Sequence, residues 1–383
     1  LCAHGTFQAV HGALHNVTVE DEEVDGRRSL YPSCVDWDDG RPGLGGGGHF
    51  LVGSAASPFL LSISDAGVMQ KHLLNVESDH GCSLSILGIK IDPRQNRVLV
   101  VLHSFDGSCT PFDALAAYDL SSKRRIFLAV LHNVSAAGSY DSRPIAHHVC
   151  IDHHGNAYVT NSAHNFVWKV DSNGMPSVFL SSPLFLSHLP VVDNPAAQEE
   201  HPHSPASPHH MGLNGIVYAP PGYLLLGQSN SGMLFRINLH GSDALIIECG
   251  QLFPGINGID LRSDGTLVLV SAKTIWVLKS QDSWNTAHVV DTLPNMAPSD
   301  GALAVDITFR EGQQPYILHS YVHELFAGKE VERKAFFIQE VQFPSDQDDA
   351  IWIIVGIIIL VIFIFLWRFQ MNYFFKQYTK KRV

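Results

Sequence analysis

The sequence has few charged residues and few cysteines, and it lacks several familiar site motifs. Asp, Glu, Lys and Arg make up only 16% of its 383 residues, and its 6 cysteines form no CxxC pair, which disfavours a structural zinc site. It contains neither a GxSxG elbow nor an HExxH segment, so serine-hydrolase and zincin chemistry have little support. The glycine-rich residues 43–48 lack the Lys-Ser/Thr of a phosphate loop, so no nucleotide site is expected there.

The charge balance argues against one class of partner. The formal net charge is −12, and no basic stripe occurs before residue 344, which disfavours binding to nucleic acid. Cations or basic partners would suit an acidic surface better, although a solvated acidic surface is the simpler interpretation. Because 45% of the residues are hydrophobic, the chain is long and apolar enough to bury a large core.

Six stretches of the sequence are loose copies of one another. Each has a small or polar residue, an apolar strand, a turn with Asp, Pro or Gly, and a second apolar strand. They begin at residues 31, 87, 146, 213, 255 and 300, with roughly 40–65 residues between starts. Self-similarity of this period is typical of propellers built from small antiparallel sheets. We therefore predict an all-β fold, a six-bladed β-propeller, with residues 17–19 as an outer strand that helps to close the ring.

The chain after residue 343 has a different composition. Residues 350–367 contain no charge and, at about 1.5 Å per residue, would span most of a hydrocarbon core of about 30 Å. Trp352 and Trp367 lie near the ends of this run, where aromatic residues favour the membrane interface. The sequence thus predicts one C-terminal transmembrane α-helix. The predicted organisation is an N-terminal segment (1–28), the propeller (29–343), an acidic linker (344–349), the helix (350–367) and a basic tail (368–383).

Charge bias predicts the orientation of a single-pass membrane protein. The positive-inside rule places a basic tail on the cytosolic side, or on the stromal or matrix side of an organelle. The propeller is then lumenal or extracellular. Residue 1 is Leu rather than Met, so we expect that a signal peptide or another targeting peptide preceded it. The basic residues of the tail are Arg368, Lys376, Lys380, Lys381 and Arg382.

An oxidising compartment would allow two kinds of modification. Cys82 and Cys109 flank the second repeat outside its strands and are the candidate disulfide. Asn16 and Asn133 begin N-glycosylation sequons, which makes the protein a candidate glycoprotein.

Polar residues come just before the first strand of several repeats. In a propeller the innermost strands point their starting ends at one mouth of the central channel, so residues far apart in sequence converge there. Oxygen and nitrogen side chains that face one point could hold a hard cation such as calcium. Alternatively, they cap strands and hydrogen-bond channel water. The residues at this position are Ser33, Leu87, His147, His148, Asn214, Asn257 and Asp300.

Three segments resemble one protein family. Residues 31–37 (YPSCVDW), 213–216 (LNGI) and 256–259 (INGI) are similar to segments of the senescence-marker-protein/gluconolactonase (regucalcin-like) propellers. This superfamily also includes the calcium-dependent phosphotriesterases paraoxonase and diisopropyl-fluorophosphatase, and strictosidine-synthase-like proteins. The resemblance extends over most of the predicted propeller, residues 31–343. It implies a six-bladed propeller with an axial divalent cation, usually calcium, which in active members polarises a lactone or phosphoester oxygen.

The resemblance implies a set of metal ligands that this chain keeps only in part. Asn214 matches a family Asn, whereas Ser33 replaces a Glu, Asn257 replaces an Asp and His147 replaces an Asn. Asp300 has a suitable local sequence but lies in a blade that does not usually provide a ligand. Both family carboxylates are missing, and calcium should bind far less well because anionic ligands supply most of its attraction. A softer ion such as zinc is conceivable with His147 or the histidine that follows it.

Two functions are compatible with these features. The favoured one is a membrane-anchored propeller with a degenerate metal site, acting as a lumenal or extracellular binding or scaffold module and a candidate subunit of a membrane complex. The alternative is a metal-dependent lactone or ester hydrolase. Its catalytic candidates are His147, His148 and Asp300, and its metal ligands are Asn214, Asn257, His147 and Asp300. The expected cofactor is one divalent cation, calcium before zinc, or none.

Overall fold

The structure is a computed structural model that describes most of the chain. The described residues form two compact units, Leu1–Val341 and Gln342–Val383. The strands belong to the first unit and the long apolar helix to the second. The described residues are 15–20, 30–40, 47–76, 83–105, 112–134, 143–186, 211–241, 243–295, 297–329, 331, 333, 335–343 and 355–372.

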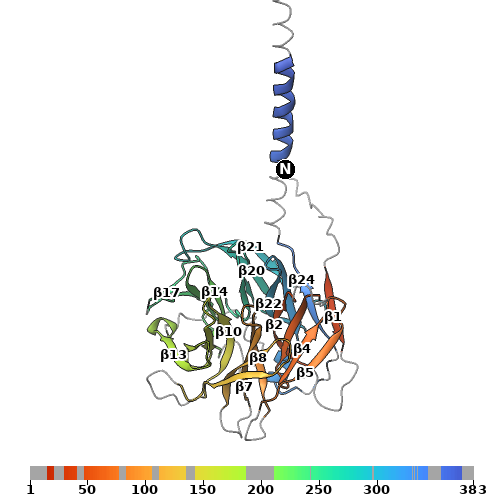
Figure 1. Cartoon of the computed structure of the whole chain (residues 1–383). Helices are drawn as coiled ribbons and strands as arrows, with labels where there is room; N and C mark the ends of the chain where they lie inside the picture. Colours follow the sequence, from red (N-terminus) through yellow and green to blue (C-terminus); the bar gives the residue numbers. More distant parts are fainter. Residues whose placement is uncertain are drawn as a thin grey trace, which may run out of the picture. The chain divides into compact units, whose positions relative to one another are not determined.

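The first unit is a six-bladed β-propeller, as predicted. Within the described residues it contains six sheets of four strands, and the chain builds most of them one after another (Figure 1). From the innermost strand outwards, blade 1 has β2 (Pro32–Asp38), β3 (His49–Ser54), β4 (Phe59–Ile63) and β5 (Met69–Leu73); blade 2 has β6 (Ser85–Asp92), β7 (Arg97–His103), β8 (Asp113–Asp119) and β9 (Arg125–Val130); blade 3 has β10 (Ala146–Ile151), β11 (Ala157–Asn161), β12 (Phe166–Val170) and β13 (Pro176–Ser181). Blade 4 has β14 (Leu213–Ala219), β15 (Tyr223–Gln228), β16 (Leu234–Asn238) and β17 (Ala244–Ile246); blade 5 has β18 (Ile259–Leu261), β19 (Leu267–Val270), β20 (Thr274–Lys279) and β21 (His288–Pro294); blade 6 has β22 (Leu303–Arg310), β23 (Gln314–Ser320), β24 (Ala335–Glu340) and β1 (Asn16–Glu20). Two short helices, η1 (Pro183–Leu186) and α1 (Val322–Phe326), follow β13 and β23.

Strand β1 closes the ring, as the sequence suggested for residues 17–19. It lies early in the chain but pairs antiparallel with β24, the last strand, with Asn16 opposite Gln339 (Figure 1). Val17 and Val19 are buried in the apolar core that blades 6 and 1 share. Because one sheet contains both ends of the propeller chain, the ring cannot open without breaking that sheet.

The second strand of a blade can be buried along its whole length. In β7 every residue is buried, which fits its run of β-branched and leucine residues between two covered faces. The ionisable residues of this strand lie at its ends, and each has a carboxylate partner. Arg97 Nε lies 3.2 Å from Asp92 Oδ2, and His103 Nδ1 lies 2.8 Å from Asp113 Oδ1. Burial of such polar groups is therefore tolerated where a hydrogen-bonding partner is within reach.

Tight turns join the first and second strands of blades 2 to 6. In blade 3 the φ angle of Gly155 is 83°, a left-handed conformation that favours glycine. Its N–H donates to the carbonyl of Asp152, and the Asp152 carboxylate accepts the N–H groups of His154 and Asn156. The Asp and Gly spacing seen in the repeats therefore builds the turn that returns the chain into the sheet.

The second unit contains one described helix, Val355–Asn372, which is long and apolar enough to cross a membrane. The sequence predicted residues 350–367, of which 350–354 lie outside the described residues, and the helix continues beyond 367 to Asn372. Most of its side chains are exposed, whereas the core helix of a globular domain would be largely buried.

The structure describes the two predicted glycosylation sites but not the predicted disulfide. Asn16 and Asn133 are exposed, so glycosylation of both remains a prediction that the surface permits. The proposed disulfide between Cys82 and Cys109 lies outside the described residues. Cys34 and Cys150 are buried free thiols, and burial raises the pKa of each, which keeps them protonated and unreactive.

His319 should make the propeller sensitive to acid. It is 1% exposed in β23, and burial lowers its pKa to about 4, from 6.5 when unfolded. Between these two pH values the unfolded chain binds a proton at His319 that the folded chain does not bind. The free energy of unfolding is therefore undiminished above pH 6.5 and falls by up to about 3 kcal/mol as the pH drops from 6.5 through 4. We expect His319→Leu to flatten this dependence of the unfolding midpoint on pH. The exposed His240→Leu should leave it unchanged, and equal slopes for the two variants would contradict the assignment.

Candidate functional site

The innermost strands bulge at equivalent points around the axis. In β2, β6, β10, β14 and β22 the pairing with the second strand shifts register at Ser33, Leu87, His147–His148, Asn214–Gly215 and Val305. In blade 5, Val270 pairs through its N–H and carbonyl with both Asn257 and Gly258, ahead of β18. A bulge re-aims side chains, and here it turns polar residues towards the centre of the ring.

Glycines let neighbouring innermost strands approach one another at this level. A Cβ atom on Gly88 of β6 would lie within 3.0 Å of the backbone of His147 in β10. A Cβ on Gly215 would lie 2.8 Å from the carbonyl oxygen of Asn257. One on Gly258 would meet Asp306 in the same way. Only residues without a Cβ allow backbones to come this close, so the glycines fix the spacing of the strands at the axis.

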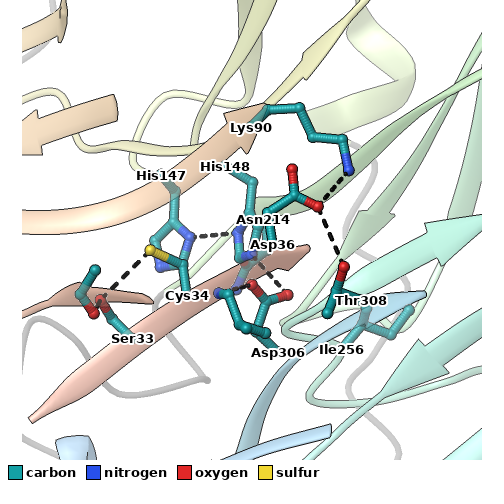
Figure 2. Close-up of polar contacts among 12 residues, drawn as sticks. Ser33, Cys34, Asp36, Lys90, His147, His148, Asn214, Ile256, Asp306 and Thr308 are labelled. Carbon is teal, nitrogen blue, oxygen red and sulfur yellow. Dashed lines mark hydrogen bonds and ion pairs between the residues drawn. The ribbon is translucent and has the colours of Figure 1, made fainter. Parts of the chain in front are cut away.

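Five buried polar residues gather at the bulges. His148 lies between His147, Asn214 and Asp306, and Ser33 lies nearby (Figure 2). We call Ser33, His147, His148, Asn214 and Asp306 the axial cluster; each is between 4% and 8% exposed. The sequence predicted four of these residues to converge, and it did not single out Asp306.

A directional chain of hydrogen bonds runs through the axial cluster. Ser229 Oγ donates to the carbonyl of Ile256, so it accepts from Asn214 Nδ2 at 2.9 Å. The amide oxygen of Asn214 is then the atom that faces His148 Nδ1, also at 2.9 Å. An oxygen can only accept, so His148 carries a proton on Nδ1. Thr160 Oγ1 anchors the same region by donating to the carbonyl of Asn214 at 2.8 Å.

This direction sets the roles of the two histidines. His147 Nδ1 lies 2.8 Å from His148 Nδ1 and must accept from it. Burial, with added repulsion from His148 and His103, holds the pKa of His147 well below its usual range, so His147 is neutral. His148 Nε2 faces Asp306 Oδ1 at 3.5 Å, and Asp306 Oδ2 accepts the N–H of Val35 at 2.9 Å. The pair thus links blade 3 to blade 6 across the ring.

A lysine and further carboxylates lie beside the axial cluster. Lys90 Nζ is 3.0 Å from Asp36 Oδ1, which also accepts from Thr308 Oγ1 at 3.2 Å (Figure 2). Burial lowers the pKa of Lys90, but the charges of Asp260 and Asp36 outweigh burial and raise it overall. Burial raises the pKa of Asp260 to about 6, against the opposing effect of Lys90. Sequence reasoning missed Lys90, although a lone lysine between Ile89 and Ile91 in an apolar strand was a usable signal.

The remaining predicted residues do not join the axial cluster. Asp300 is exposed in the turn before β22, whose first residue is Leu303 and whose bulge lies next to Asp306, and its role as a ligand or catalytic residue stays a prediction. Leu87 occupies its bulge with a buried apolar side chain. Asn257 is half-buried, and its Oδ1 atom is enclosed with no hydrogen-bond partner among the described residues.

The donor set does not fit a divalent cation as the side chains stand. Ser33 donates its hydroxyl to the carbonyls of Gly53 and Ile86, and the Asn214 oxygen is taken by His148. Of the expected ligands, only Asn257 presents a free buried oxygen. Across the part of the chain that the structure describes, no group of three or more His, Cys, Asp or Glu is placed to hold a metal ion. A hard cation needs several oxygen ligands around one point, and the described side chains do not provide such a set as they stand.

The glycine spacing at the axis can be tested by Gly88→Ala. The new Cβ would clash with the backbone at His147 and His148, so we expect a loss of about 1–3 kcal/mol from overpacking. Gly222→Ala is the matched control, because its Cβ would meet nothing closer than 3.8 Å. Chemical unfolding of the full-length chain in detergent measures both. Equal effects of the two variants would show that strand spacing at the axis is not under this constraint.

Comparison with known proteins supports the fold and no closer relationship. No protein-family model matches the chain, and no curated protein matches its sequence. The major allergen Mala s 1 of Malassezia sympodialis is 13% identical, over 86% of this chain and 97% of the allergen, with a TM-score of 0.62. A gluconolactonase from Xanthomonas campestris is 13% identical, over 83% and 88% of the two chains, with a TM-score of 0.50. A glucose dehydrogenase is 12% identical, over 85% and 99%, with a TM-score of 0.50.

Likeness at such low identity concerns the arrangement of blades and not the chemistry of the site. The gluconolactonase and the glucose dehydrogenase are named for different activities, and the allergen is named for none. This agrees with one fold that carries several functions. The chain has the six-bladed propeller fold of gluconolactonase-like proteins, and the resemblance first seen in three sequence segments is confirmed at the level of the fold.

Proposed function

We propose that this protein is a membrane-anchored, gluconolactonase-like propeller that works as a binding or scaffold module without hydrolytic activity. One observation carries the proposal: the side chains at the axial mouth are committed to one another. His148 Nδ1 is shared by His147 and Asn214, and Asn214 is held in turn by Ser229. Hydrolysis would need these atoms free to bind a cation or to activate water.

Loss of the family carboxylates supports the same conclusion. Ser33 stands where the resembled family has Glu, and its hydroxyl joins the backbones of blades 1 and 2 through Gly53 and Ile86. The position is therefore used to hold strands together. A side chain that donates to backbone carbonyls presents no negative charge to a substrate-bound cation.

A metal-dependent lactone or ester hydrolase remains the second candidate. Two buried atoms favour it, Asn257 Oδ1 and His148 Nε2, since neither has a hydrogen-bond partner within the described ranges. They could be ligands only if His148 turned away from Asp306, which its Nε2 faces at 3.5 Å. This function therefore demands a rearranged site, whereas the scaffold function uses the site as it is.

The anchoring part of the proposal rests on the C-terminal helix. Val355–Asn372 suffices in length and composition to span a bilayer, and basic residues follow it in the sequence. The positive-inside rule then puts the tail in the cytosol, or in the stroma or matrix, and the propeller in a lumen or outside the cell. A protein partner within the same membrane, as in a membrane complex, suits a propeller that is held near the bilayer without an enzymatic role.

An activity panel tests the first part of the proposal. The purified full-length chain in detergent is assayed with gluconolactone, other lactones and aryl esters, with and without a chelator. We expect rates within about twofold of those of Asn214→Ala and His148→Gln, because those residues do not take part in turnover. The exposed His240→Gln serves as the control. Turnover that is lost in both axial variants and on chelation, but kept in the control, would establish the hydrolase instead.

A protease-protection experiment tests the orientation. The full-length chain is inserted into sealed microsomes, and protease is added outside. We expect the propeller to be protected, and Asn16→Gln and Asn133→Gln each to remove one glycan, because both residues are exposed on the same unit. Detergent should abolish the protection. A propeller digested in sealed vesicles and free of glycan would show that the membrane orientation is reversed or absent.

A further inference from the structure

One lysine and three carboxylates share the centre of the propeller. Lys90 comes from β6, Asp36 from β2, Asp260 from β18 and Asp306 from β22, which are innermost strands of four different blades. Each of the three carboxylates acts electrostatically on Lys90.

The carboxylate next to Lys90 is held in one position. Asp36 Oδ2 accepts the N–H of Ile91 at 2.8 Å, and Asp36 Oδ1 accepts from both Lys90 Nζ and Thr308 Oγ1. Donors from β6 and β22 thus bind one carboxylate of β2. The Asp36 side chain is 7% exposed, so its charge depends on these partners and not on bulk water.

The position of the Lys90 side chain lets its positive charge act on more than one carboxylate. The side chain is 30% exposed, whereas Ile89 and Ile91 on either side are buried, so Lys90 lies on the other face of the strand, where its Nζ atom is 3.0 Å from Asp36 Oδ1. Asp306, the third acid, is fixed by the N–H of Val35, so its carboxylate also stays at the axis.

Buried carboxylates from different blades repel one another unless a cation lies among them. Removing the cation would leave uncompensated charges where water screens poorly. In the family that the sequence resembles, a divalent cation lies at the axis, and the expected ligands here do not fit one. The three carboxylates of this chain, Asp36, Asp260 and Asp306, still need a positive charge near them.

We propose that the ammonium group of Lys90 is the built-in cation of the propeller axis, which holds the innermost strands of blades 1, 2 and 6 together through Asp36 and makes a divalent cation unnecessary for the fold. The inference goes beyond the proposed function, because it concerns what holds the ring together and does not depend on whether any substrate is turned over. A lysine is covalently tethered, so the charge is present without any dependence on metal supply.

The decisive variant is Lys90→Met, which keeps a long unbranched side chain and removes the charge. The full-length chain in detergent is unfolded thermally at pH 8. We expect the midpoint to fall by at least about 5 °C, because the buried Asp36 carboxylate is left without its positive partner. Lys169→Met, on the third strand of blade 3, is the matched control and should shift the midpoint by less than about 2 °C. An equal shift in the two variants would overturn the proposal.

A second substitution separates charge from packing. Asp36→Asn alone should destabilise the protein, but Lys90→Met with Asp36→Asn should lose clearly less than the sum of the two single losses, since the unpaired charge is removed. If Lys90→Met alone does not fold, recovery of folding in the double variant supports the proposal, and no recovery overturns it. Wild-type midpoints should also be the same with EDTA, calcium or zinc. A chelator that lowers the wild-type midpoint would show that a metal ion, and not Lys90, is the axial cation.

Discussion

The close approach of six innermost strands around one axis is the constraint on which the rest of the propeller depends. Glycines at positions such as Gly88 and Gly258 let the strands meet without a Cβ between them, and bulges relieve the pairing at the same level. The ring also needs a sheet that joins its two ends, which β1 and β24 provide. Every side chain that reaches the axis is therefore placed by backbone geometry that the whole ring imposes.

Polar groups crowded at this axis are enclosed, so each needs a partner. His148 Nδ1 uses Asn214, Asn214 uses Ser229, and Asp36 uses Lys90, whereas His148 Nε2 and Asn257 Oδ1 have no hydrogen-bond partner within the described residues. The paired groups hold one another in position and stiffen the centre. One solved structure with this fold is named a gluconolactonase, so the architecture alone does not decide whether such a propeller is an enzyme.

Much of the fold could be predicted because each blade is specified locally. Apolar strands and turns with Asp, Pro or Gly recur six times, and each copy contains its own turn chemistry, as at Asp152 and Gly155. The axial positions were predictable where a bulge follows a recognisable unit, as at Asn214. The sequence pointed to Asp300 and not to Asp306, because sequence alone does not show where a strand begins or where its register shifts; the strand begins at Leu303, three positions after Asp300.

The sequence by itself determined the six-fold repeat, the innermost strands and the separate apolar C-terminal helix, because strand period, turn residues and hydrophobic length are all local properties. Only the tertiary structure decided which charges meet at the axis. Lys90 and Asp36 are 54 positions apart and meet where blades 1 and 2 pack together, whereas His148 and Asp306 lie in opposite blades and meet only when the ring closes. Electrostatic energy depends on distance in space and on burial, and neither can be read along a chain.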